Sequence, residues 1–350
     1  MLLITDDEVS GALSVRDCIP AMEDAFRDLA DGTATDTPRE RMFIGAKGDP
    51  KLYSLGRQCG ALQRSQVAAL RVMSNRRAKV RGTKDNHFIL LFSTETGQLL
   101  ALIQGFTLSG LRLGATTAVA AKYLAPAREL EVGVFGTGKQ ARANFEGIAA
   151  VTKIRRAKVF SRSAEHRREF CDAMERRLRV SVVPVESPKE AVVGSDLVLG
   201  ATNANTPIYD GHWLEQGALA ISLRNSDRFK RPREFDDTVI QRSAFVVVCS
   251  KQQLMHDDQR EILDPLEKGY TSWEKIYELT EVVSGKFPGR KTAADILFYH
   301  SNAGNGIQFA TVGYKAYAAV KKLGNCRELP DDWFTTDISS WWERGYHPTP

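Results

Sequence analysis

One stretch of this 350-residue chain constrains its fold more than any other part of the sequence. An apolar run, residues 132–135, leads directly into Gly136-Thr-Gly-Lys-Gln-Ala141, a helix-like segment follows, and a second apolar run ends at Ser161-Arg162. We expect a strand, a glycine turn, a helix and a second strand. In such a βαβ unit the glycines permit a tight turn and close approach to a pyrophosphate, and the small residue lets the helix pack on the sheet. The stretch predicts a dinucleotide site, with a purely structural glycine turn as the alternative.

The end of the second strand indicates which dinucleotide is bound. An acidic residue there would accept hydrogen bonds from the ribose 2′-hydroxyl of NAD. This strand instead ends at Ser161-Arg162-Ser163, and Arg167 and Arg168 follow. Guanidinium groups and hydroxyls suit a 2′-phosphate, because arginine presents a fork of donors to phosphate oxygens. NADP(H) is therefore favoured and NAD(H) stays open, while the alternative interpretation is a solvated basic start of a helix.

Composition excludes several classes of protein. The 48 basic and 43 acidic residues are mixed along the chain, so the net charge of +5 favours anionic small ligands over nucleic acid. No apolar run approaches the length of a membrane span, and residues 1–7 are too acidic for a signal peptide. The five scattered cysteines predict reduced thiols in a cytoplasmic protein. His256-Asp257-Asp258 lacks further ligands at matching spacing, so we expect no metal.

Hydrophobic patterning divides the chain into three parts. The first predicts helices at 18–31 and 108–124, the second of them rich in small residues, and strands at 42–44, 52–55, 67–73, 87–92 and 99–103, the last two forming a hairpin. From residue 130 strands alternate with helices, which predicts a parallel, doubly wound sheet. The six strands expected there are 131–135, 157–161, 181–185, 196–201, 218–223 and 244–249.

Beyond residue 290 the pattern is helical again, over 304–323, and this helix is expected to return to the first part. The segment from Pro330 onward carries Trp333, Trp341 and Trp342. It is typical of an irregular tail that packs on another surface, such as a second subunit. The expected fold class is α/β, a Rossmann domain inserted in an α+β domain.

Several segments of the chain form a distinctive combination. The most specific is Gly110-Leu-Arg112-Leu-Gly-Ala-Thr-Thr-Ala-Val-Ala-Ala-Lys-Tyr-Leu-Ala125, six residues before the glycine-turn stretch. Supporting segments are Ser195-Asp-Leu-Val-Leu-Gly-Ala-Thr202 with Pro207, Trp213-Leu-Glu-Gln-Gly-Ala218, and Ser301-Asn-Ala-Gly-Asn-Gly-Ile-Gln-Phe-Ala310. Together they resemble the ornithine cyclodeaminase/mu-crystallin family, from the N-terminal helix to about residue 325.

The resemblance implies a homodimer with an NAD(P)-binding Rossmann domain at residues 123–306. Residues 1–122 plus 307–350 would form the substrate-binding and dimerisation domain. Activities in the family include ornithine cyclisation, alanine dehydrogenation, reduction of cyclic ketimines and iminosuccinate, and cleavage of an amino-acid conjugate. All of them pass hydride between nicotinamide and a carbon that bears nitrogen. The residues expected at the cofactor are Gly136, Thr137, Gly138, Gln140, Ala141, Ser161, Arg162 and Thr202.

A 2-amino or 2-imino acid needs its carboxylate clamped, and guanidinium groups do this with two parallel hydrogen bonds. Arg112 matches the family's carboxylate-binding arginine, and Arg41 resembles a second clamp residue. Arg71 lies inside an apolar strand, where a lone charge must find a partner or a ligand. The family usually has lysine there. Because arginine is a poor general base, the acid or base could instead be Lys79, Lys84, a bound water or the substrate amine.

A second departure from the family concerns the turn after the fifth Rossmann strand. In ornithine cyclodeaminases an aspartate in this turn handles the side-chain amine of the substrate. Here Ser226 takes that register and Asp227 follows it. Ketimine reductases of the mu-crystallin type also have a serine at this position. A shift of the register by one residue would instead place Asp227 there and restore the aspartate.

We therefore expect an NAD(P)H-dependent reductase or dehydrogenase of a small 2-imino or 2-amino acid. Arg41, Arg71 and Arg112 would bind the substrate carboxylate. One alternative is a cyclodeaminase that recycles its NAD, and another is a non-catalytic NADPH-binding protein. The residues expected in catalysis are Arg71, Arg112, Ser226 and Asp227.

Overall fold

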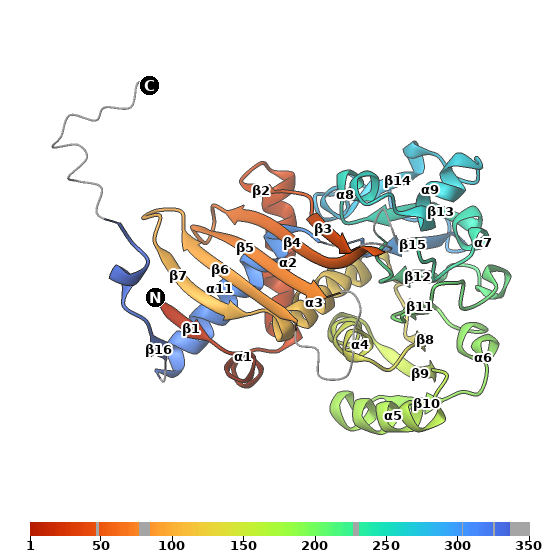
Figure 1. Cartoon of the computed structure of the whole chain (residues 1–350). Helices are drawn as coiled ribbons and strands as arrows, with labels where there is room; N and C mark the ends of the chain where they lie inside the picture. Colours follow the sequence, from red (N-terminus) through yellow and green to blue (C-terminus); the bar gives the residue numbers. More distant parts are fainter. Residues whose placement is uncertain (47–48, 77–84, 227–230, 303, 325, 337–350) are drawn as a thin grey trace.

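The computed structural model describes residues 1–46, 49–76, 85–226, 231–302, 304–324 and 326–336. Two sheets of eight strands each dominate the fold, and they lie side by side with helices between and around them (Figure 1). The chain builds most of the first sheet, then the whole second sheet, and finally returns to the first. None of the described helices combines the length and apolar character that a membrane crossing needs.

The first sheet has the strand order β16-β1-β7-β6-β5-β4-β2, with β3 also paired to β4. Pairing is antiparallel throughout except between β1 and β7. All five strands expected in this part are present, including the β6–β7 hairpin. The strands are β1 (Leu2–Ile4), β2 (Ala34–Asp36), β3 (Glu40–Ala46), β4 (Asp49–Leu62), β5 (Val67–Arg76), β6 (Asn86–Ser93), β7 (Leu99–Gln104) and β16 (Arg327–Glu328).

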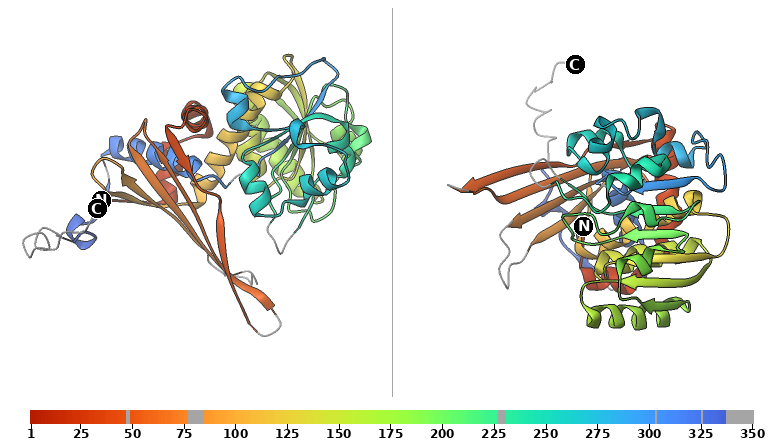
Figure 2. Two further views of the ribbon diagram at one scale, coloured as in Figure 1. Left: turned by 90° about the horizontal axis from the view of Figure 1, so that it is seen from above. Right: turned by 90° about the vertical axis from the view of Figure 1, so that its right-hand side faces the viewer.

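Helices cover one face of this sheet (Figure 2). Ile89, Leu91, Ala101 and Ile103 point to that face and are fully buried. The alternation along β6 and β7 explains this, because successive side chains of a strand point to opposite faces. The helices of this part are α1 (Asp6–Ala12), α2 (Val15–Ala30), α3 (Phe106–Leu124) and α11 (Gly306–Leu323).

The small residues of α3 serve close packing against α4 (Lys139–Val151), the helix of the glycine turn. A Cβ atom on Gly114 would lie 2.4 Å from the Ala143 carbonyl oxygen of α4. No larger residue fits there, so the two helices meet at their backbones. This contact fixes Arg112, on α3, relative to the glycine turn.

The second sheet is entirely parallel, in the order β10-β9-β8-β11-β12-β15-β13-β14. It confirms the expected doubly wound sheet, and all six predicted strands are present. The strands are β8 (Leu130–Phe135), β9 (Ile154–Phe160), β10 (Ser181–Pro184), β11 (Leu197–Gly200), β12 (Leu219–Ser222), β13 (Ser243–Val248), β14 (Ile276–Glu278) and β15 (Ile296–His300). Besides α4, the helices are α5 (Ala164–Leu178), α6 (Pro188–Val192), α7 (Asp237–Arg242), α8 (Lys251–His256), α9 (Arg260–Glu267) and α10 (Leu279–Val283).

One expectation was wrong: the chain beyond residue 290 does not pass straight into a helix. Residues 296–300 form β15, which lies between β12 and β13. All five of its residues are buried. A strand buried on both faces shows no alternation, so its apolar run cannot be distinguished from part of a helix by periodicity.

After β15 the chain enters α11, which packs on the helix-covered face of the first sheet as expected (Figure 1). In the C-terminal tail, Trp333 is 68% exposed and belongs to neither hydrophobic cluster of the described residues. Trp341 and Trp342 lie outside the described residues.

Candidate active site

The glycine turn joins β8 to α4 at the centre of the second sheet. Gly136 has φ +97°, and a Cβ atom there would lie 2.5 Å from the Ala201 carbonyl oxygen. A Cβ atom on Gly138 would meet nothing within 4 Å, so the backbone there faces open space. Since β8 lies between β9 and β11, the turn also sits where the strand order reverses, which is where doubly wound sheets bind dinucleotides.

A cavity of about 1190 Å³ opens along this turn. Small-molecule sites usually occupy about 300–1,000 Å³, so the cavity has room for a dinucleotide. Its lining includes seven of the eight residues expected at the cofactor. The exception is Ala141, which belongs to α4, is fully buried and serves the packing of that helix. The seven are Gly136, Thr137, Gly138, Gln140, Ser161, Arg162 and Thr202. The glycine turn, the reversal of strand order beside it and the size of the cavity all fit a bound dinucleotide.

The rim of the cavity at the end of β9 is basic. Arg162 and His166 line it beside Ser161, and His166 was not foreseen from the sequence. Arg167 does not belong to this rim: it is buried, donates to the Ser161 carbonyl oxygen at 2.6 Å and pairs with Glu186. Its role is to hold the end of the strand.

Arg71 on β5 and Arg112 on α3 lie against one aromatic ring. Their guanidinium carbons are 4.5 and 5.1 Å from the centroid of Phe309 on α11. Arg71 donates to Gln58 Oε1 at 2.6 Å, and Arg112 donates to Gln308 Oε1 at 3.0 Å. Both arginines are at least 94% buried.

Within the described part of the chain, no carboxylate balances the charge of this pair. Among the described residues no carboxylate forms an ion pair with Arg71 or Arg112, and the Nε atom of each lacks a hydrogen-bond partner. Burial and the charge of Arg39 lower the pKa of Arg112 to about 10, and burial with the charges of Arg112, Arg39 and Arg41 lowers the pKa of Arg71. A buried cation is costly without a counter-charge. The arrangement is therefore built to receive an anion, and a planar carboxylate matches it best.

Arg41 lies close to this pair but has a different partner. Its Nη1 atom is 3.1 Å from Asp257 Oδ1, and Arg39 pairs with the same carboxylate. Asp257 is the residue that ends α8, so these ion pairs connect β3 to the second sheet's helices. The His256-Asp257-Asp258 stretch thus supplies a structural counter-charge.

A family model describes the whole of this arrangement. The model of the ornithine cyclodeaminase/mu-crystallin family matches residues 1–315. The chain belongs to that family.

Two curated relatives and one solved structure of similar proteins carry names that describe an activity. The chain is 29% identical to the Δ1-pyrroline-2-carboxylate reductase of Bacillus cereus over 62% of this chain and 66% of that protein. It is 30% identical to the ketimine reductase mu-crystallin of Rattus norvegicus over 57% and 59%. The Thermococcus litoralis Δ1-pyrroline-2-carboxylate reductase, solved with NADH and L-proline, matches with a TM-score of 0.85 and 28% identity over 94% of this chain and all of that one.

In this family member the turn after β12 forms part of the cofactor cavity, through Leu223, Arg224 and Asn225. Ser226 follows them and is 5% exposed. Asp227 lies outside the described residues, as do Lys79 and Lys84.

A buried polar cluster supports this turn from behind. His300 Nε2 contacts the Arg224 carbonyl oxygen at 2.9 Å, and Glu234 Oε1 accepts from both N and Oγ1 of Thr202 at 2.7 Å. Burial and the neighbouring charge of Glu261 raise the pKa of Glu234 to about 7. The cluster was not foreseen, because its members are far apart in the sequence.

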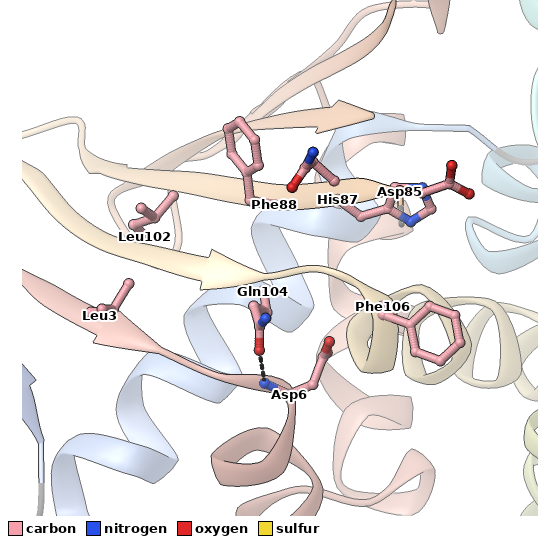
Figure 3. Close-up of a pocket in the computed structure, with 9 residues that line it drawn as sticks. Leu3, Asp6, Asp85, His87, Phe88, Leu102, Gln104 and Phe106 are labelled. Carbon is pink, nitrogen blue, oxygen red and sulfur yellow. Dashed lines mark hydrogen bonds between the residues drawn. The ribbon is translucent and has the colours of Figure 1, made fainter. Parts of the chain in front are cut away.

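A second, smaller cavity of about 490 Å³ lies where β1, β6 and β7 meet the start of α3 (Figure 3). Asp6, Asp85, His87 and Phe106 contribute to its wall. Gln104 Oε1 accepts from the backbone N–H of Asp6 at 2.8 Å, which joins β7 to α1. Phe106 is the first residue of α3.

The residues that contact Arg71 and Arg112 were also not predicted from the sequence. Gln58 and Gln308 are uncharged, and Phe309 reads as an ordinary core residue. One signal was available for Gln308 and Phe309, because both fall in the segment 301–310 that carried the family resemblance.

Proposed function

We propose that this protein is an NAD(P)H-dependent reductase or dehydrogenase of a small 2-imino or 2-amino acid. The observation that carries the proposal is the pair of buried guanidinium groups, Arg71 and Arg112, without a carboxylate partner among the described residues. The relatives support the proposal, because their names describe reductases of Δ1-pyrroline-2-carboxylate or of ketimines.

In this proposal the chain's own residues bind and orient the substrate. Arg71 and Arg112 hold the substrate carboxylate, and the two glutamines and Phe309 keep the guanidinium groups in place. When bound, the nicotinamide supplies or accepts the hydride. Fixing the carboxylate sets the α-carbon in one position for that transfer. The burial of both arginines also limits attack of water on an imine. Arg71 keeps its proton, because an arginine in a protein is not deprotonated.

Within this function we propose that NADP(H) is preferred over NAD(H). Ser161, Arg162 and His166 line the cavity at the end of β9. A guanidinium, an imidazole and a hydroxyl together suit a 2′-phosphate. We also propose that Ser226 lies at the side chain of the substrate, where a serine favours reduction over cyclisation.

We also propose a homodimer in which the first sheet carries the substrate and dimer contacts. No described helix or strand covers the face of this sheet opposite its helices (Figure 2). Its side chains are apolar and only half-buried, which marks an interaction surface. They include Leu70, Val72, Phe88, Leu90, Phe92 and Leu102. The mass in solution tests this, and Leu90→Arg is expected to give a monomer. A cytoplasmic location remains our expectation.

The function is tested by following NADPH oxidation with Δ1-pyrroline-2-carboxylate and larger cyclic or linear 2-imino acids. We expect saturable oxidation with at least one of them. L-Ornithine converted to proline and ammonia without net NADH would instead identify a cyclodeaminase. Tight NADPH binding with no oxidation across the panel would identify a non-catalytic binding protein.

A further inference from the structure

Two buried carboxylates lie behind the wall of the cofactor cavity. The side chains belong to Glu234 and Glu261, which are 0% and 2% exposed. Glu234 Oε1 accepts from N and Oγ1 of Thr202, a residue that lines the cavity. Glu261 Oε1 accepts from the backbone N–H groups of Glu234 and Phe235, at 2.6 and 2.8 Å. Each carboxylate therefore uses one oxygen to hold the chain and has a second oxygen left.

The second oxygens of the two carboxylates meet at one hydroxyl group. Ser222 Oγ lies 2.6 Å from Glu261 Oε2 and 3.3 Å from Glu234 Oε2, and it accepts from the backbone N–H of Arg224 at 3.2 Å. A serine hydroxyl has one hydrogen and can donate it to only one of the two carboxylates. The shorter contact is the one to Glu261, so the contact to Glu234 is satisfied when Glu234 carries a proton and donates it to Ser222. The geometry thus indicates one proton on the pair, and places it on Glu234.

The groups around the pair leave its charge uncompensated. His300 Nε2 donates to the Arg224 carbonyl oxygen and lies 3.3 Å from Glu261 Oε2, but its Nδ1 has no hydrogen-bond partner among the described residues. A second N–H on this ring would be buried without an acceptor, so His300 stays neutral. Arg224 and Tyr209 also face Glu234, and Arg224 donates from Nη2 to Asn205 Oδ1.

The proton on Glu234 can leave near neutral pH. Burial and the charge of Glu261 raise the pKa of Glu234 to about 7, against the hydrogen bonds from Thr202. The pair therefore changes from one negative charge to two across the physiological range of pH.

Strand order indicates which half of the cofactor lies in front of this pair. In the proposed binding mode the 2′-phosphate lies at the end of β9 and the pyrophosphate at the glycine turn after β8. The order β9-β8-β11-β12 leaves the ends of β11 and β12 for the nicotinamide, because the dinucleotide lies across the strand ends. Thr202 and Arg224 line the cavity there. Oxidised nicotinamide carries a positive charge, and reduced nicotinamide does not.

We propose that Glu234 and Glu261 determine how strongly the protein prefers the oxidised over the reduced cofactor. The doubly charged pair attracts oxidised nicotinamide, and the proton on Glu234 weakens this attraction. The inference rests on the proposed function only in its use of a nicotinamide cofactor. Binding and protonation are linked, so NADP⁺ should release the Glu234 proton to solvent when it binds, whereas NADPH should not.

The experiment measures the Kd of NADP⁺ and of NADPH by calorimetry from pH 6 to 8.5. The ratio of the two Kd values is informative, because both forms carry the same phosphates and any titration of those phosphates or of the basic rim cancels. For wild type we expect Kd(NADP⁺)/Kd(NADPH) to fall on the order of tenfold as pH rises through about 7. In buffers of different ionisation enthalpy, NADP⁺ should release about half a proton more than NADPH does between pH 6 and 7.

Two variants and a control separate the charge from a structural role. Glu234→Gln resembles the protonated acid and can still accept from Thr202, so its ratio should stay near the value of wild type at pH 6. Glu261→Gln removes the like charge, so the fall in the ratio should move to lower pH. Glu131→Gln is the control, since Glu131 is also buried but lies at the start of β8, where it pairs with Arg155 and Arg156. It should keep the dependence of wild type.

A ratio that is independent of pH in wild type would overturn the inference, as would an unchanged dependence in Glu234→Gln. A dependence that stays at the same pH in Glu261→Gln would also overturn it, and this variant decides the matter if Glu234→Gln does not fold. Binding of neither form would overturn the cofactor proposal and this inference together. Binding of both forms without reduction of any imino acid would overturn only the proposed function.

Discussion

Arg71 and Arg112 stack on the same ring, that of Phe309, at 4.5 and 5.1 Å from its centroid. One arginine comes from the first sheet, the other from the helix that meets the glycine turn, and the ring from the helix that closes the fold. Each guanidinium is bonded to a neutral glutamine. The neutral glutamines do not balance the two buried charges, which leaves the positive charge available for an anionic ligand.

The first test introduces the missing negative charge. Gln308→Glu would place a carboxylate against Arg112, where Gln308 Oε1 now accepts at 3.0 Å. The new ion pair would compete with the substrate carboxylate, so we expect KM for the imino acid to rise on the order of 10²-fold. The melting temperature should stay equal or rise.

Gln308→Met is the uncharged control, since it removes the hydrogen bonds of Gln308 to Arg112 and Thr116 and adds no carboxylate. It should raise KM far less than Gln308→Glu and lower the melting temperature. Equal KM values for the two variants would show that Arg112 does not bind the substrate.

Arg71→Lys restores the residue that the family usually has on β5. Lysine is a point charge and cannot form two parallel hydrogen bonds, so we expect kcat/KM to fall by roughly tenfold through KM. The control is Arg57→Lys on β4, whose arginine is exposed and paired with Glu40. Unchanged KM in Arg71→Lys would remove Arg71 from the clamp.

Cofactor choice is tested at the end of β9. Arg162→Ala should raise KM for NADPH by roughly tenfold or more and leave KM for NADH nearly unchanged, because only NADPH carries the 2′-phosphate. Arg168→Ala is the control, since Arg168 is exposed on α5 but does not line the cavity. The same effect on both cofactors would contradict a 2′-phosphate site.

The pKa of Glu234 predicts how stability depends on pH. Burial and the charge of Glu261 raise this pKa from 4.5 to about 7. Between these values the folded protein keeps a proton that the unfolded chain has released. The free energy of unfolding should therefore decrease as pH rises from about 4.5 to about 7, by up to roughly 3 kcal/mol.

Glu234→Gln resembles the protonated acid and should remove most of this dependence. Urea unfolding at pH 5 and pH 8 measures it, with the exposed Glu175→Gln on α5 as control. If Glu234→Gln keeps the full decrease, another group is responsible.

Much of the fold could be predicted, because local sequence determines it. The glycine turn, the alternating β6–β7 hairpin and the small-residue helix α3 each have a pattern that only one structure satisfies. β15 was missed since a strand buried on both faces has no periodicity. Arg71 was identified as a charge inside an apolar strand, which is a local observation.

The partners of the site residues could not be predicted, because they depend on register and distant contacts. Gln58 stands directly opposite Arg71 only once β4 and β5 are paired. Asp257 meets Arg41 across more than 200 residues of sequence.

The most direct test of hydride transfer to a 2-imino acid bound by Arg71 and Arg112 uses NADPH that carries deuterium at both positions of C4 of the nicotinamide. With an imino acid that the enzyme reduces, one deuterium should appear on the α-carbon of the product amino acid, as measured by mass spectrometry. At a substrate concentration below KM, the rate at which the label appears should fall on the order of 10²-fold with Gln308→Glu. NADPH oxidation without deuterium in the product, or label transfer that is unaffected by Gln308→Glu, would contradict the account.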